Sequence, residues 1–163
     1  MKKRIIAASL ASIALVSAAL VASPRNQTQA ATAANVITAD GAGEFATGAT
    51  FQGIALAGGT FGIAVQTNTD TSAEGDLELQ LNGSSLAGLS QWITITGWIT
   101  SGTVNPDNSV SLSGTGTLDM GDGTIPAGGL PLVATITATN VQVTIGGNAV
   151  PTLPKSDGWI TVE

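Results

Sequence analysis

The chain has 163 residues and contains no cysteine and no histidine, which excludes disulfides, the usual soft metal sites and every nucleophile system built on Cys or His. Its formal net charge at pH 7 is −6, and an acidic chain is a poor partner for nucleic acid or anionic lipid surfaces. It has only 5 Lys and Arg residues and is rich in Gly, Thr, Ala, Val and Ile, so we expect an all-β fold.

The start of the chain predicts an export signal. Met1–Arg4 are positively charged, Ile5–Ala22 form an uncharged apolar run, and small residues follow, which is the order typical of a secretory signal peptide. We therefore expect a signal-peptide helix within residues 1–33 and a single all-β domain over 34–163. A retained membrane anchor is the alternative, since the apolar run is about as long as a spanning helix. Cleavage after residue 33 leaves Lys155 as the one cation against 11 acidic residues, a net charge of −10.

The first part of this domain predicts short strands. We expect residues 31–43 to be a loose lead-in with at most a short strand over 36–38. Two strands should follow over 49–57 and 59–68, joined by a turn at Ala57-Gly58-Gly59.

The next strand is predicted over 76–82, where apolar and polar residues alternate with a period of two. This alternation points Leu77, Leu79 and Leu81 inward and the residues between them outward. Residues 84–90 form a connector.

A long β-hairpin over 91–120 is the clearest element. Three isoleucines alternate with Thr and Trp in its first strand, and residues 105–108 (NPDN) supply the turn chemistry. The apolar residues expected to face the core are Ile93, Ile95, Ile99, Val110, Leu112 and Leu118.

The last third predicts a surface loop, a bulged strand and a short final strand. Residues 121–131 are rich in Gly and Pro, as loops are. In residues 132–145 the apolar positions change from even to odd numbers, which indicates a β-bulge near Thr139-Asn140. Residues 159–162 form the final strand. The total of about seven to nine strands predicts an antiparallel sandwich or a partly closed barrel.

Two tryptophans suggest a binding surface. Trp92 and Trp98 share one face of their predicted strand with Thr94 and Thr96, opposite the isoleucines. If that face meets solvent, the indoles and hydroxyl groups form an amphipathic platform suited to sugar rings or a polymer. The alternative is that a second layer covers these tryptophans or that they cap strand ends, and we expect this alternative because Trp is seldom left bare.

Acidic residues offer two further candidate sites. Asp76 and Glu78 could supply the two carboxylates of a glycosidase, but we expect them to be the solvated side of an amphipathic strand. Asp119 and Asp122 offer oxygen ligands for calcium, the one metal cofactor the composition leaves open. We expect these two carboxylates to accept hydrogen bonds from their own turn instead.

Several segments resemble a known family when taken in order. They are GTFGIAVQT, ITITGWITSGTV, SVSLSGTGTLDMGDG and VATITATNVQVTI, within residues 59–145. This order resembles the small secreted bacterial β-domains of the post-choice-of-anchor type, found beside cell-surface anchoring modules. The resemblance implies an extracellular, non-catalytic role and supplies no site residues.

Together these observations predict a secreted or cell-surface bacterial β-protein with a structural or interaction role and no enzymatic activity. Its expected partners are copies of itself, a cell-surface polysaccharide or a matrix protein, with no membrane contact after signal cleavage. The main alternative is a carbohydrate- or polymer-binding module that uses Trp92 and Trp98. Less favoured alternatives are a carboxylate-based hydrolase and an ice-binding protein that uses the threonine rows.

Overall fold

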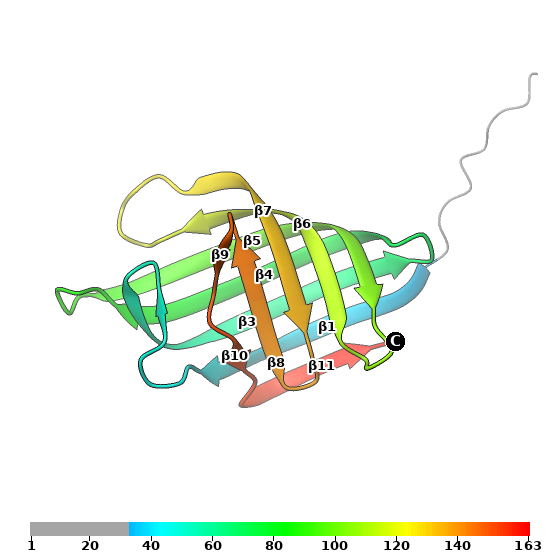
Figure 1. Cartoon of the computed structure of the whole chain (residues 1–163), viewed down its shortest axis with the longest axis horizontal. Coiled ribbons are helices and arrows are strands. Elements are labelled where there is room, and N and C mark those ends of the chain that lie inside the picture. Colours follow the sequence, from blue (N-terminus) through cyan, green and yellow to red (C-terminus); the bar gives the residue numbers. More distant parts are fainter. Residues whose placement is uncertain (1–32) are drawn as a thin grey trace, which may run out of the picture.

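A computed structural model describes residues 33–163, which form strands and turns without a helix (Figure 1). The strands make one antiparallel sheet of 11 strands, in which the main path runs β10-β8-β7-β6-β5-β4-β3-β1-β11. The strands are β1 (Ala33–Glu44), β2 (Thr50–Phe51), β3 (Ile54–Asn68), β4 (Ser72–Ser84), β5 (Ser90–Val104), β6 (Val110–Asp119), β7 (Ala127–Ile136), β8 (Asn140–Ile145), β9 (Asn148–Ala149), β10 (Leu153–Pro154) and β11 (Asp157–Val162).

The sheet curls into a half-barrel whose own two parts enclose the core. In Figure 1, β7 and β8 cross steeply in front of the long strands β1, β3 and β4. Alternate residues along each strand point into the space between them. Leu79 on β4 lies opposite Ile95 on β5, and both are at most 1% exposed. Burial of each such side chain contributes about 1.5–3 kcal/mol, so the alternation predicted for β4, β5 and β6 is confirmed as the basis of the core.

The N-terminal strands differ from the prediction. β1 is a strand of 12 residues where a loose lead-in was expected, and β3 continues through Gly58 and Gly59, where a turn was expected. Gly58 does not turn the chain because it pairs with Glu44 on one side and Asn82 on the other. The irregularity there is a register shift between Leu56 and Gly58, so these glycines bend the strand without ending it.

The bulge predicted within residues 132–145 is also wrong. These residues form the β7–β8 hairpin, in which Ile136 pairs with Val141 and the Thr137 amide donates to the Asn140 carbonyl at 2.9 Å. A tight turn changes the apolar phase just as a bulge does, so the two cannot be told apart from the pattern of side chains. The neighbouring loop is also shorter than expected, because β7 already begins at Ala127.

The C-terminal segment joins the two ends of the sheet. β9 and β10 pair with β8, and β11 then pairs with β1 at the opposite end of the strand order. Between them, the Ser156 amide donates to the Ala42 carbonyl at 2.9 Å. Leu153 is 0% exposed and belongs to the core, with its Cδ1 atom beside Gly43. We call this contact between residues 153–156 and β1 the seam.

The predicted signal peptide lies almost entirely outside the described residues. Within residues 33–163, the structure has no helix of the length and apolar character needed to cross a membrane.

Candidate functional site: an outer tryptophan face

The phenylalanines and the tryptophans of this chain lie in different environments. Its three phenylalanines are buried at no more than 8% exposure (Phe45, Phe51 and Phe61). Its three tryptophans are exposed instead: Trp92 at 64%, Trp98 at 49% and Trp159 at 51%. The expectation that a second layer covers Trp92 and Trp98 is therefore wrong. The sheet encloses its core by curling on itself, so the outer side of β5 receives no covering layer.

Strand register brings the three tryptophans to the same face. Trp159 on β11 lies opposite Asp40, which lies opposite Gly62 on β3. The same row continues through Glu78 to Thr96 on β5. Residues directly opposite one another in a sheet share a face, so this row spans five strands on the outside of the half-barrel. We call the outward residues of β11, β1, β3, β4 and β5 the outer tryptophan face.

The tryptophans on this face are widely spaced. Trp92 and Trp98 are six positions apart on β5, which corresponds to about 20 Å at the usual rise of a strand. Trp159 lies four strands away from β5, again about 20 Å at the usual strand spacing. Such distances suit an extended ligand that contacts more than one indole, rather than a single small molecule held between them.

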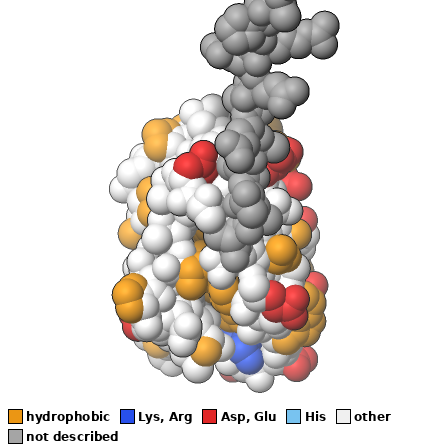
Figure 2. All heavy atoms as spheres, turned by 90° about the vertical axis from the view of Figure 1, so that its right-hand side faces the viewer, with side chains coloured by type: hydrophobic (Ala, Val, Ile, Leu, Met, Phe, Trp, Pro, Cys, Tyr) orange, Lys and Arg blue, Asp and Glu red, His pale blue; other side chains and the backbone are white. Residues whose placement is uncertain are grey.

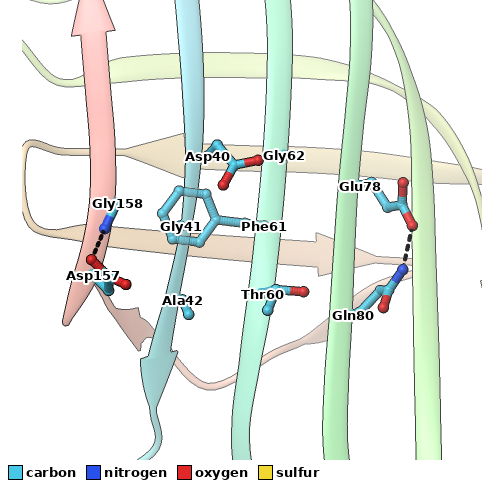
Figure 3. Close-up of a pocket in the computed structure, with 10 residues that line it drawn as sticks. All are labelled: Asp40, Gly41, Ala42, Thr60, Phe61, Gly62, Glu78, Gln80, Asp157 and Gly158. Carbon is cyan, nitrogen blue, oxygen red and sulfur yellow. Dashed lines mark hydrogen bonds between the residues drawn. The ribbon is translucent and has the colours of Figure 1, made fainter.

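A groove follows β3 across this face. The outward residues of β3 include Gly58, Gly62 and Ala64, which give the groove a low floor, while β1 and β4 carry longer side chains on either side. One part of the groove, about 640 Å³, extends from Trp159 to Asp76 and Glu78 on β4. Another, about 650 Å³, extends toward Trp92. Figure 3 shows the part between them, with the Asp40 and Glu78 side chains on either side of Gly62.

The groove is strongly acidic. Six exposed carboxylates lie on the outer tryptophan face: Asp40, Glu44, Glu74, Asp76, Glu78 and Asp157. Acidic side chains accordingly line the right-hand side of Figure 2, the side that corresponds to the back of Figure 1. Lys155 is the one Lys or Arg among residues 33–163, and its Nζ atom donates to the Gly158 carbonyl at 3.2 Å.

Two of these six carboxylates accept hydrogen bonds from near neighbours. Glu78 accepts one from the Gln80 side chain at 2.7 Å, and Asp157 accepts one from the Gly158 amide at 2.8 Å. Both bonds are drawn in Figure 3, where Asp40 makes no hydrogen bond to the other residues shown. Six carboxylates on this face thus compare with a single nearby cation, Lys155, among the described residues.

The structure brings the residues predicted as a binding platform to one exposed face. Thr94 and Thr96 lie between Trp92 and Trp98 along the outer side of β5. Asp76 and Glu78 lie on the neighbouring strand, on the solvated side, and form one wall of the groove. Ligand binding by these residues remains a prediction.

Sequence reasoning missed the other wall of the groove. Trp159 could have been placed outward from the alternation of its strand, in which Ile160 and Val162 pack against the core. Nothing local indicated that this strand pairs with β1, so the position of Trp159 beside Asp40 could not be foreseen.

Asp119 and Asp122 are engaged in their own turn. Asp119 accepts a hydrogen bond from the Gly121 amide at 2.8 Å, and Asp122 accepts bonds from the amide and the hydroxyl of Thr124. Within residues 33–163 there is no group of three or more His, Cys, Asp or Glu placed to hold a metal ion. The turn interpretation therefore describes the geometry of both carboxylates.

Two hairpin loops share one motif that sequence reasoning overlooked. Residues 68–72 (NTDTS) and 105–109 (NPDNS) both read Asn-x-Asp-x-Ser, and they close the β3–β4 and β5–β6 hairpins. In each loop the Asp carboxylate accepts from the amide and the hydroxyl of the Ser two residues on. The residue between them has positive φ in both, 68° at Thr71 and 61° at Asn108. The repeated pentapeptide was the available signal.

These loops predict a pH dependence of stability. The Ser72 and Ser109 hydrogen bonds hold the pKa of Asp70 and Asp107 below the usual 3.8. A lowered folded-state pKa stabilises the fold fully above the unfolded pKa, and this contribution is lost as the pH falls through the folded pKa. We expect Asp107→Asn to lower Tm at neutral pH, and we expect its Tm to converge with that of the wild type as the pH falls below 3.8 and through the lowered pKa of Asp107. Ser109→Ala should behave alike, and a Tm difference independent of pH in both variants would contradict this role.

No family model, curated protein or solved structure matches this chain, so the interpretation of the outer tryptophan face depends on its geometry and chemistry.

Proposed function

We propose that the protein is a secreted or cell-surface binding module without catalytic activity, and that the outer tryptophan face binds a polysaccharide chain. The observation that carries the proposal is the exposure of all three tryptophans on one face while all three phenylalanines are buried. An exposed indole presents a large, rigid apolar surface to solvent. Removing this surface from water by contact with a ligand contributes favourably to the free energy of binding.

The groups between the tryptophans also suit a sugar polymer. Hydroxyl, amide and carboxylate groups from Thr94, Gln80 and Glu78 lie on the same face. Sugar hydroxyls can donate to all three groups and can accept from the hydroxyl and the amide. The β3 groove is open along its length, as an extended polymer requires. The predicted export signal and the resemblance to secreted β-domains beside anchoring modules support an extracellular setting.

The test is intrinsic tryptophan fluorescence during titration with a panel of soluble polysaccharides. Binding should shift the emission, and Trp98→Ala and Trp159→Ala should each weaken binding about 10- to 100-fold, as expected for aromatic residues at the centre of an interface. Leu86→Ala and Ile125→Ala are matched controls, since both are more than 90% exposed but lie in loops outside the face. The proposal fails if no polysaccharide binds, or if the tryptophan variants bind as the wild type does.

A further inference from the structure

Resting on the proposed function, we infer that the preferred ligand of the outer tryptophan face is a polysaccharide that carries free amino groups, such as an oligomer of glucosamine. The inference comes from which side chains lie beside the tryptophans and from the charge of the groove between them.

Two of the three tryptophans have an aspartate as their direct cross-strand neighbour. Trp159 on β11 lies opposite Asp40 on β1, and Trp98 on β5 lies opposite Asp76 on β4. The Cβ atoms of such pairs are about 4.5–5.5 Å apart, so each carboxylate lies beside an indole. Trp92 differs, because its neighbour on β4 is Asn82.

An indole beside a carboxylate suits a cation better than a neutral group. The face of the indole attracts an ammonium group through its quadrupole, and the carboxylate adds a charge-assisted hydrogen bond. The two Trp–Asp pairs lie on opposite sides of the β3 groove, and the part of the groove that holds about 640 Å³ is lined by Trp159, Asp40 and Asp76 together. A polymer with repeated amino groups can reach both pairs at once.

The charge of the face argues against other polysaccharides. A uronic acid polymer would place its carboxylates against those of the groove, and like charges across an interface cost free energy. A neutral polymer would remove water from the carboxylates and offer them hydroxyl donors, but no opposite charge. A protonated amine, in contrast, is attracted to the carboxylates of the groove, and its N–H groups donate charge-assisted hydrogen bonds to them.

The experiment compares four ligands of matched length by calorimetry at pH 5.5: β-1,4-linked oligomers of glucosamine, N-acetylglucosamine and glucose, and an oligomer of galacturonic acid. We expect glucosamine to bind at least tenfold more tightly than its acetylated form, with an affinity that falls as salt is added. Galacturonic acid should bind most weakly. Equal binding of the first three would overturn the inference and leave the proposed function standing, whereas binding of none would overturn both.

Charge variants test whether Asp40 and Asp76 cause the preference for glucosamine. The double variant Asp40→Asn with Asp76→Asn keeps the shape of both side chains, so it should remove most of the preference for glucosamine over the acetylated oligomer. Asp107→Asn, an exposed acid in the β5–β6 loop outside the face, is the matched control. Retention of the full preference in the double variant would overturn the inference.

Gly62→Leu tests the groove itself. A Cβ atom at Gly62 meets no atom within 4 Å, so a side chain can be added there without strain and will fill the floor of the groove. We expect at least a tenfold loss of glucosamine binding without a decrease in Tm. Gly128→Leu is its control, since the nearest atom to a Cβ there is 3.6 Å away and the residue lines none of the groove. Undiminished binding by Gly62→Leu would exclude the β3 groove as the site.

Discussion

Replacing Leu153 with aspartate is expected to unfold the protein, whereas the same replacement at Leu86 should leave it folded. Leu153 is 0% exposed at the seam, and Leu86 is 99% exposed in the β4–β5 turn. The change at Leu153 removes a core leucine and buries a carboxylate without a partner, which together cost at least about 4 kcal/mol. Ordinary domains have only about 5–15 kcal/mol of stability in total.

Urea unfolding followed by circular dichroism measures both variants against the wild type. Leu86→Asp should change the free energy of unfolding by no more than about 0.5 kcal/mol. A cooperative transition for Leu153→Asp at the wild-type midpoint would show that residues 153–156 do not hold the sheet together.

A second large effect is expected from adding one methyl group at Gly43. A Cβ atom there would lie beside the carbonyl oxygen and carbon of Pro154, where there is no room for it. Because both neighbours are backbone atoms, β1 and the C-terminal segment must move apart, and we expect Gly43→Ala to cost about 2–3 kcal/mol. For a domain of this size that lowers Tm by about 10 °C.

Gly62→Ala is the matched control on the neighbouring strand. Its new methyl group enters open space on the groove floor, and replacing a glycine within a strand should stabilise the fold by about 0.5–1 kcal/mol. Thermal unfolding of both variants should therefore give Tm changes of opposite sign. Two changes of the same sign would contradict the close approach of the strands at Gly43.

The sequence predicts those strands and hairpins whose structure depends on residues close together in the chain. The alternation of residues 76–82 and of the hairpin over 91–120 determines which side chains are buried, because adjacent antiparallel strands pair through short turns. Leu81 and Ile93 show this: each is recognisable from its own strand, and both are 0% exposed. The turn at residues 105–108 is likewise encoded by its own Asn, Pro and Asp.

The parts that could not be predicted depend on partners far away in the chain. β1 has too weak an alternation to be recognised alone, and it is a strand because β3 and β11 pair with both of its edges. Ile37 pairs with Val162 across most of the domain, and no local pattern announces that contact. The exposure of Trp92 and Trp98 was missed for a related reason: whether a face is covered depends on how the whole sheet curves.

The seam has a consequence for how the molecule is made. A ribosome releases β1 before β11, yet β1 gains its second neighbouring strand only when β11 pairs with it. Until then, the growing chain is a ribbon with bare edges at β1 and at β8, and bare strand edges invite pairing with other chains. The sheet therefore cannot be completed before β11 has been synthesised, and a chain stopped short of residue 153 is expected to fold poorly and to aggregate.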